Sequence, residues 1–317
     1  MTQTTGKRER IAILGSTSHI AKGLIYHLGR DGDYDLCLFA RSPECTGGFL
    51  NAIGLGSRFK AQPFEGFGKE SYRAVINCVG IGNPGKLSNA GSSIFRVTES
   101  FDTLALDHLK RSPDTLYINF SSGAVYGTDF ASPVDDHSPA MFDINPMNPA
   151  AYYGIAKLHS EARHRAMKDH RIVDLRVFGY FSRFIDLDAK YMMSEIMSCI
   201  LHGKEFVTNS EDIIRDFIHP EDLASMVKLC IAKRDLNNAF DVCSLQPARK
   251  FEILEKFSSL YGLRYTIEER HDSVSVTGRK ANYYSTSGRI RTIGFSPRFA
   301  SMDCLIRESA FILPPAG

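Results

Sequence analysis

The stretch "RIAILGSTSHIAKGL", residues 10–24, decides the fold that we expect of this 317-residue chain. A short apolar run ends at Gly15, and after a few small polar residues the apolar positions recur at helical spacing. A strand that turns through glycine directly into a helix is typical of a parallel α/β sheet. The alternation continues through the first half, with strands expected at 10–15, 35–40, 73–80, 115–120 and 172–178 and helices at 19–29, 92–110 and 149–169.

This pattern predicts an α/β fold with a Rossmann-like, doubly wound parallel sheet, because continuous apolar strands need cover on both faces. From about residue 179 the pattern loosens, and helices are expected near 189–202, 220–232 and 249–261. We therefore expect a smaller mixed α/β C-terminal domain. Residues 1–178 and about 213–245 are assigned to the Rossmann domain, and about 179–212 and 246–317 to the second domain.

Composition excludes several classes of protein. The net charge is +2, the pI is near 8.1, and the basic residues are spread along the chain, so neither nucleic acid nor a membrane is expected as a partner. Seven scattered cysteines without a C-x-x-C indicate neither a disulfide framework nor a zinc site. The start "MTQTTGKRER" is polar, and the apolar run after it is too short for a signal segment. A cytoplasmic protein is expected, with a small charged metabolite left open as ligand.

The turn after the first strand partly matches a dinucleotide phosphate site. Gly15 allows a tight turn, whereas Ser18 and Ala21 stand where the dinucleotide fingerprint usually has glycine. The helix that follows offers backbone N–H groups and positive potential to a pyrophosphate. A plain strand-to-helix turn is the alternative. The candidate cofactor contacts in this turn are Gly15, Thr17, Ser18, His19 and Ile20.

The second strand ends in "LFAR", residues 38–41, about 20 residues after the glycine turn. An acidic residue here would accept hydrogen bonds from a ribose and repel a 2′-phosphate, but the chain has neutral Ala40 and cationic Arg41. The sequence therefore favours NADP(H) over NAD(H) as cofactor. A solvated arginine at a strand end is the alternative.

Two further motifs follow in order. "INFSSGAVYG", residues 118–127, places Ser122 at the carboxyl end of an apolar strand, which faces the ligand crevice in a doubly wound sheet. "AYYGIAKLHSE", residues 151–161, places Tyr153 and Lys157 four residues apart on one face of a helix. With 13 Tyr and 15 Lys in the chain, chance alone gives roughly 0.6 such pairs, so the pair gains its meaning from the other motifs.

These elements in this order resemble the extended short-chain dehydrogenase/reductase superfamily, specifically its NAD(P)-dependent nucleotide-sugar epimerase, dehydratase and reductase branch. The resemblance extends over essentially the whole chain. Three later segments are similar to those of the family: "LRVFGYFSR" at 175–183, "RDFIHPEDLASMV" at 215–227 and "STSGRIRTIGFSP" at 285–297. The resemblance implies that the first domain binds NAD(P) and the second binds a nucleotide sugar.

The resemblance implies roles for individual residues. Tyr153 would be the general acid/base, Lys157 would bind the nicotinamide ribose and lower the tyrosine pKa, and Ser122 would hydrogen-bond the reacting oxygen. Ionising a tyrosine at pH 7 asks for roughly 4 kcal/mol, and a positive charge about 5 Å away supplies about 3 kcal/mol at an effective dielectric of 20. Arg215 would hold the substrate diphosphate, a salt bridge being its alternative role, and Arg279 or Lys280 is a weaker candidate for the same group.

Several positions depart from the family pattern. Gly179 stands where many relatives have asparagine, and residues 94–104 contain no asparagine for the family's helix position. Gly123 and Ala124 stand where relatives that eliminate water carry an acidic pair, so 4,6-dehydratase activity is not expected. His159 and His164 lack the H-E-x-x-H order of a zinc site and are expected to be solvated helix residues, and no metal is expected.

The leading hypothesis is an NADP-dependent oxidoreductase that reduces the keto group of a nucleotide-activated 4-keto-6-deoxy sugar in carbohydrate biosynthesis. The alternative is a nucleotide-sugar 4-epimerase, which oxidises C4 transiently and uses no net cofactor. Arg41 favours reduction, because NADPH is poised to donate hydride. An inactive NADP-binding sensor is a third hypothesis, motivated by the altered glycine turn. The resemblance also implies a homodimer formed through the helices near 92–110 and 149–169.

Overall fold

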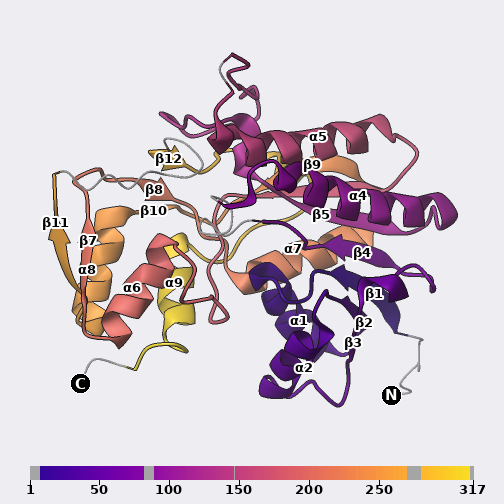
Figure 1. The fold of residues 1–317 in the computed structure, drawn as a ribbon, viewed down its shortest axis with the longest axis horizontal. Coiled ribbons are helices and arrows are strands. Elements are labelled where there is room, and N and C mark those ends of the chain that lie inside the picture. Colours follow the sequence, from indigo (N-terminus) through magenta and orange to yellow (C-terminus); the bar gives the residue numbers. More distant parts are fainter. Residues whose placement is uncertain (1–7, 82–88, 146, 234, 270–279, 315–317) are drawn as a thin grey trace.

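The computed structural model describes residues 8–81, 89–145, 147–233, 235–269 and 280–314. Its centre is a seven-stranded sheet in which every pair of neighbouring strands is parallel. The strand order β3-β2-β1-β4-β5-β6-β9 confirms the predicted Rossmann-like, doubly wound arrangement (Figure 1). The strands are β1 (Glu9–Leu14), β2 (Tyr34–Phe39), β3 (Ala61–Gln62), β4 (Ala74–Asn77), β5 (Leu116–Ser122), β6 (Ile172–Val177) and β9 (Asn237–Val242).

Helices cover both faces of this sheet, and β1 shows why both faces are apolar. Ile11 and Ile13 pack with α1 (His19–Asp31), α2 (Pro43–Ala52) and α7 (Pro220–Lys233). Ala12 and Leu14 point to the opposite face and pack with α4 (Ser93–Arg111), beside which α5 (Tyr152–Ala166) lies. In Figure 1, α4 and α5 lie on one side of the sheet and α1 and α2 on the other. The alternation of side chains along each strand therefore supplies two cores.

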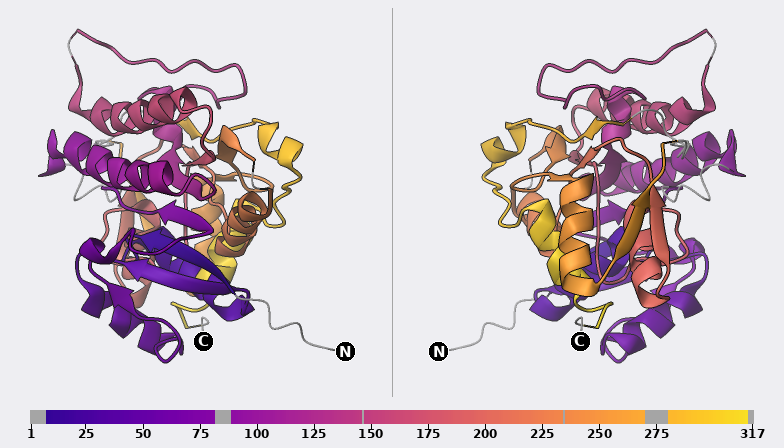
Figure 2. Two further views of the ribbon diagram at one scale, coloured as in Figure 1. Left: turned by 90° about the vertical axis from the view of Figure 1, so that its right-hand side faces the viewer. Right: turned by 90° about the vertical axis from the view of Figure 1, so that its left-hand side faces the viewer.

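The remaining chain forms a smaller mixed α/β part, as predicted. Its core joins α6 (Met192–Leu201), α8 (Lys250–Tyr261) and α9 (Ser301–Ser309) to β7 (Glu205–Thr208), which pairs with β11 (Arg264–Ile267). A second small sheet has the order β10-β8-β12, with β10 (Ala248–Arg249), β8 (Ile214–Arg215) and β12 (Asn282–Tyr283). Figure 2 shows the three helices gathered beside the large sheet.

The exact domain limits remain a prediction, and two observations refine them. Strand β9 lies within the returning segment 213–245 and adds the seventh strand to the sheet. By contrast, Ile290 and Ile293, in the short helix η4 (Arg289–Ile293), pack into the core of the large sheet although 246–317 was assigned to the second domain. Within the described parts of the chain, no helix is both long and apolar enough to span a bilayer.

The expectation that both histidines of α5 are solvated is right for His159 and wrong for His164. His164 is fully buried, with Nε2 2.7 Å from an Asp102 oxygen on α4 and Nδ1 2.8 Å from an Asp174 oxygen on β6. Burial disfavours the charged imidazole, but the hydrogen bonds and charges of the two aspartates prevail and raise the pKa of His164 to about 9. A buried imidazolium therefore joins α4, α5 and β6.

The two aspartates of this triad have further polar partners. Tyr117 donates to Asp102 at 3.0 Å, and Asn119 donates to Asp174 at 2.8 Å. Arg163 and Arg165 form ion pairs with Asp102 and Asp174, respectively. Buried charges are tolerated when their partners and hydrogen bonds are complete, whereas removal of one partner is costly.

We expect His164 to make stability depend on pH in the alkaline range. The pKa rises from 6.5 to about 9 on folding, so its contribution, roughly 3 kcal/mol, is complete below pH 6.5 and is lost as the pH rises through about 9. His164→Gln should be less stable than wild type at pH 6 and should lack this alkaline loss. Urea unfolding from pH 6 to 10 measures both effects, with His159→Gln as the exposed control on the same helix. Equal pH slopes in wild type and His164→Gln would contradict the assignment.

Candidate active site

The carboxyl ends of β1, β4 and β5 bring the predicted site residues to one edge of the sheet. The turn after β1 begins at Gly15, and its φ of 78° is left-handed, which suits glycine. A Cβ at Gly15 would lie 2.9 Å from a side-chain carbon of Val79, just past β4. The absence of a side chain thus lets the β1 turn approach the end of β4 closely.

The turn leaves backbone donors available for a phosphate group. Ser18 caps α1, because its hydroxyl accepts from the Ala21 N–H at 3.3 Å. Among the described residues, no group accepts a hydrogen bond from the N–H of Thr17, His19 or Ile20. Free N–H groups at the start of a helix, beside a turn that glycine makes compact, fit a dinucleotide pyrophosphate. Ser18 therefore replaces the usual glycine without removing the helix start.

The other side chains of this turn have separate environments. Thr17 is exposed, and Ile20 packs against the core of the large sheet. His19 instead reaches the segment after β6, where its Nε2 lies 2.8 Å from Ser182 Oγ and its ring packs edge-on against Tyr180. Burial lowers the pKa of His19 to about 4, so its imidazole is neutral at physiological pH.

Arg41 follows the buried end of β2 and is itself exposed. In the parts of the chain that the structure describes, no acidic side chain forms an ion pair with it. Its guanidinium is therefore available to a ligand, and α2 begins two residues later at Pro43. The predicted contact with a 2′-phosphate remains a prediction.

Ser122, Tyr153 and Lys157 come together where β5 meets α5. Ser122 is the last residue of β5, and its hydroxyl lies within hydrogen-bonding reach of the Tyr153 phenol. Lys157 is buried and donates to the Phe120 carbonyl at 2.8 Å, and its Nζ lies 6.0 Å from the centroid of the Tyr153 ring. The three residues, which are separate in the sequence, thus form one compact cluster in the structure.

Lys157 is not among the groups that shift the pKa of Tyr153 in this structure. Burial raises the pKa of Tyr153, and the hydrogen bond from Ser122 acts in the opposite direction. Burial also lowers the pKa of Lys157, while the charges of Asp102 and Asp174 raise it. Because the ammonium is directed at Phe120, the lowering of the tyrosine pKa by Lys157 remains a prediction for the enzyme with its cofactor bound.

Gly154 explains how α5 reaches the serine so closely. A Cβ at Gly154 would lie only 2.2 Å from the carbonyl oxygen of Ala124, in the short helix η2 (Gly123–Tyr126) that follows Ser122. Helix α5 therefore packs directly on the backbone of η2. Because Tyr153 precedes Gly154, this backbone contact sets the position of the phenol.

Arg215, which is predicted to hold the substrate diphosphate, lies on the small sheet. Arg215 on β8 is partly buried and donates to the carbonyl oxygens of Ile214 at 2.8 Å and Lys280 at 2.5 Å. Lys280 has its Nζ 4.0 Å from the centroid of the Tyr283 ring, and burial, followed by the charge of Arg215, lowers its pKa to about 7. Arg279 lies outside the described residues. The salt bridge considered for Arg215 is not present among them.

Two of the departures from the family pattern have a steric counterpart. A Cβ at Gly123 would lie 2.3 Å from a ring carbon of Phe178, so an acidic side chain could not enter there without displacement of that ring. A Cβ at Gly179 would lie 2.4 Å from the Asp216 carbonyl oxygen, which leaves no room for asparagine on this backbone. Both positions therefore need glycine for packing.

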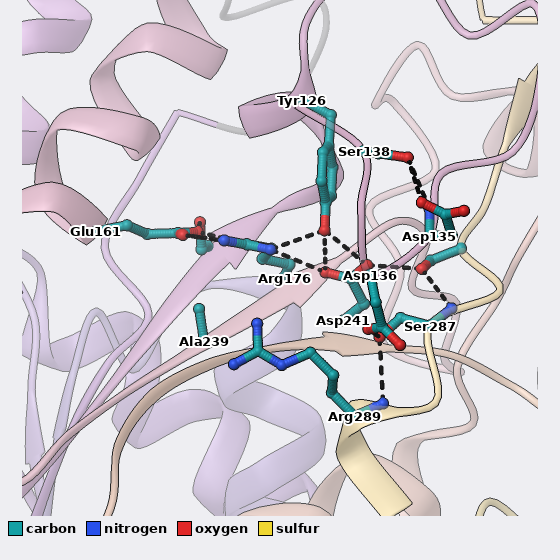
Figure 3. A network of polar contacts seen from close by, with 12 residues as sticks. Tyr126, Asp135, Asp136, Ser138, Glu161, Arg176, Ala239, Asp241, Ser287 and Arg289 are labelled. Atoms are coloured by element: carbon teal, nitrogen blue, oxygen red, sulfur yellow. Dashed lines mark hydrogen bonds and ion pairs between the residues drawn. The ribbon is translucent and has the colours of Figure 1, made fainter. Parts of the chain in front are cut away.

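Sequence reasoning missed Tyr283, whose phenol oxygen lies 3.0 Å from Ser122 Oγ. It also missed a polar network behind the cluster, drawn in Figure 3. Arg176 on β6 lies between Glu161 on α5, at 2.6 Å, and the Tyr126 hydroxyl, at 2.8 Å. Tyr126 in turn donates to Asp241 on β9 at 3.0 Å. The run of small and polar residues in "YYSTSG", 283–288, was the sequence feature that could have pointed to Tyr283 and to the polar contacts of this segment.

A cavity of about 210 Å³ adjoins this network. Tyr126, Arg176, Asp241 and Arg289 are among the residues that line it, whereas Ser122, Tyr153 and Lys157 do not. Several of its polar walls are paired with one another: Arg176 donates to Tyr126 at 2.8 Å, Tyr126 donates to Asp241 at 3.0 Å, and Ser287 donates to Asp136 at 2.5 Å. The cavity is therefore part of the support of the site and is separate from the reaction centre.

A seven-stranded, doubly wound parallel sheet with a glycine turn after its first strand is the fold of the extended short-chain dehydrogenase/reductase class. The chain belongs to the NAD dependent epimerase/dehydratase family, whose model matches residues 11–243. A comparison with curated protein sequences gave no significant match. The family resemblance inferred from the sequence is thereby confirmed, and with it an NAD(P)-dependent enzyme.

Similar solved structures share this fold at low sequence identity. UDP-glucose-4-epimerase from Stenotrophomonas maltophila, with bound NAD and formylated UDP-arabinopyranose, has a TM-score of 0.78 and 18% identity over 95% of this chain and 97% of that one. UDP-glucuronic acid 4-epimerase from Bacillus cereus, with UDP-glucuronic acid and NAD, has a TM-score of 0.76 and 17% identity over 96% of this chain and 98% of that one. dTDP-glucose 4,6-dehydratase from Bacillus anthracis, with NAD, has a TM-score of 0.76 and 13% identity over 96% of each chain.

We expect Gly154→Ala to destabilise the protein by about 1–3 kcal/mol, because the added methyl group meets the Ala124 carbonyl oxygen at 2.2 Å. Gly47→Ala is the matched control, since Gly47 lies in α2 and an added Cβ meets nothing within 4 Å. That change should be neutral or stabilising by up to about 1 kcal/mol. Urea unfolding measures both changes, and equal stability of the two variants would contradict the packing assigned to Gly154.

Proposed function

We propose that this protein is an NAD(P)-dependent nucleotide-sugar 4-epimerase. The observation that carries the proposal is the cluster of Ser122, Tyr153 and Lys157 at the carboxyl edge of the sheet, next to the glycine turn. Family membership supports a nucleotide-sugar reaction at this edge. The sequence alone placed a reductase first on the strength of Arg41. The 4-epimerases among the structural neighbours favour the alternative hypothesis.

In this proposal the three residues act on one oxygen of the sugar. Tyr153, as the phenolate, takes the proton of the C4 hydroxyl and later returns it, while Ser122 donates a hydrogen bond to the same oxygen. Lys157 contributes positive charge that favours the phenolate and binds the cofactor ribose. A bound nicotinamide would supply an acceptor for the hydride of C4 and would be its donor after the 4-keto sugar presents its other face, so that C4 is inverted with no net use of cofactor. Because burial raises the pKa of Tyr153, the site would depend on Ser122 and Lys157 to ionise the phenol.

Cofactor and substrate contacts belong to the proposal as well. The N–H groups after Gly15 would hold the pyrophosphate of the dinucleotide, and the free guanidinium of Arg41 favours NADP, whereas the similar solved structures contain NAD. Arg215 on β8 and Lys280, two residues before β12, would hold the diphosphate of the nucleotide sugar, whose negative charge would favour the protonated form of Lys280. Arg279 remains a weaker candidate for the same group.

One observation favours a second function. Arg41 is exposed and unpaired among the described residues, and a preference for NADP suits an enzyme that reduces a nucleotide-activated 4-keto-6-deoxy sugar. A homodimer formed through α4 and α5 is compatible with either function and remains a prediction. An inactive sensor is the least supported hypothesis, because the cluster of Ser122, Tyr153 and Lys157 is complete.

Denaturing release of copurified cofactor, followed by incubation with UDP-, dTDP- and GDP-sugars, tests the function. We expect bound NAD(P) and interconversion of C4 epimers without net consumption of cofactor. Tyr153→Phe should reduce turnover by at least about a thousandfold while cofactor stays bound, because the acid/base group is removed. Stoichiometric oxidation of NADPH by a 4-keto-6-deoxy substrate would instead establish the reductase. Full turnover by Tyr153→Phe would refute the mechanism.

We expect Arg41→Ala to weaken NADP binding by roughly tenfold or more and to leave NAD binding nearly unchanged, because a charge-assisted hydrogen bond to the 2′-phosphate is lost. Titration calorimetry with each cofactor measures the two affinities. Lys110→Ala is the control, an exposed cation on α4 whose partner is Asp107. Equal affinity of wild type for NADP and NAD would remove the role assigned to Arg41.

A further inference from the structure

Tyr283 brings a second phenol to the reaction centre from the C-terminal part of the chain. Its oxygen lies 3.0 Å from Ser122 Oγ, and only 6% of the residue is exposed. Its ring packs against Phe130 and Phe178, with centroid distances of 4.8 and 5.1 Å. The phenol is therefore held in one place by aromatic contacts, and its polar end meets the proposed catalytic serine.

The backbone around Tyr283 is fixed on both sides. The Asn282 N–H donates to the Phe130 carbonyl at 2.9 Å, and the Tyr284 carbonyl accepts from the Val134 N–H at 3.2 Å. Two residues after Tyr283, the Ser285 hydroxyl donates to Asp241 at 2.6 Å, which joins this segment to the network of Figure 3. The contact with Ser122 is thus supported by three hydrogen bonds from different elements.

A backbone donor lies beside both hydroxyl groups and is compatible with one particular direction of the hydrogen bonds. Two hydroxyl groups can donate to each other in either sense, but the Ala124 N–H can only donate. It donates to Ser122 Oγ at 3.2 Å and also lies within hydrogen-bonding reach of the Tyr283 oxygen. If Tyr283 accepts from Ala124 and donates to Ser122, the serine oxygen has two donors and its own proton is left for Tyr153.

We propose that Tyr283 is a positioning residue, whose phenol donates to Ser122 and so turns the serine proton toward Tyr153 and the reacting oxygen. The inference rests on the acid/base role given to Tyr153 in the proposed function. Burial raises the pKa of Tyr283, so this phenol keeps the proton that it would donate to Ser122. A chain of hydrogen bonds that run in one direction strengthens each member, so the bond that Ser122 gives to the Tyr153 phenolate is strengthened.

Tyr283→Phe tests the direction of the chain, because the ring and its contacts with Phe130 and Phe178 are kept. The ionisation of Tyr153 is followed by phenolate absorbance across pH with saturating NADP⁺, and is assigned by subtraction of the corresponding Tyr153→Phe protein. We expect the pKa of Tyr153 to rise by about half a unit in Tyr283→Phe. If Tyr283 instead accepts the serine proton, its loss frees that proton for Tyr153 and the pKa falls. A fall or no change would overturn the proposal.

Kinetics provide a second readout. With the nucleotide sugar that wild type converts, Tyr283→Phe should lower kcat about tenfold and change KM less than about twofold, because ground-state binding is kept. In a Ser122→Ala background, Tyr283→Phe should have no further effect on kcat, since the phenol acts through the serine. Additive losses would overturn the proposal. Tyr284→Phe, at the adjacent residue, is the control and should behave as wild type.

The two readouts separate this inference from the proposed function. If wild type converts none of the nucleotide sugars and the phenolate titration still shifts upward in Tyr283→Phe, the epimerase proposal fails and the role of Tyr283 stands. If wild type is active and neither kcat nor the titration responds to Tyr283→Phe, the role of Tyr283 is refuted and the proposed function stands.

Discussion

The imidazolium of His164, held between Asp102 and Asp174, fixes the position of α5 and with it the reaction centre. It joins the helix to α4 on one side and to β6 on the other, and all three members of the triad are buried, so the loss of one partner leaves a buried charge uncompensated. Tyr153 and Lys157 lie on the same helix, two to three turns earlier. The charges of Asp102 and Asp174 also act on Lys157, where they favour the ammonium against the effect of burial. A single ionic triad therefore serves both packing and chemistry.

Small residues complete what the triad begins. Without a side chain at Gly154, α5 lies on the Ala124 carbonyl, and without one at Gly123 the serine loop lies on Phe178. The contact at Gly154 is between two backbones, and the contact at Gly123 is with the Phe178 ring, so both glycines allow close packing around Ser122 and Tyr153. Behind them, the network of Arg176 and Asp241 ties the loop to β9 and to the segment after β12 (Figure 3).

The sequence predicts the large sheet well because each of its main strands is a continuous apolar run followed by a turn or a helix start. It fails at α2, whose "PECTGGFLNA" contains two glycines and little periodicity, and at α9, which is short. The motif residues at the ends of β1 and β5 were found because parallel strands place their carboxyl ends at one edge. The burial of His164 was missed because both of its partners are remote in sequence, on α4 and β6.

Tyr283 marks a different limit of prediction, because 161 positions separate it from Ser122 and β12 has only two residues. No periodicity can be read from so short a strand. Its pairing with β8 sets Tyr283 opposite Arg215, the residue proposed to hold the substrate diphosphate. The two strands therefore place in register the cation proposed to hold phosphate and the proposed positioning residue of Ser122. In this proposal, the part of the chain that binds the substrate also orients the proton that the reaction needs.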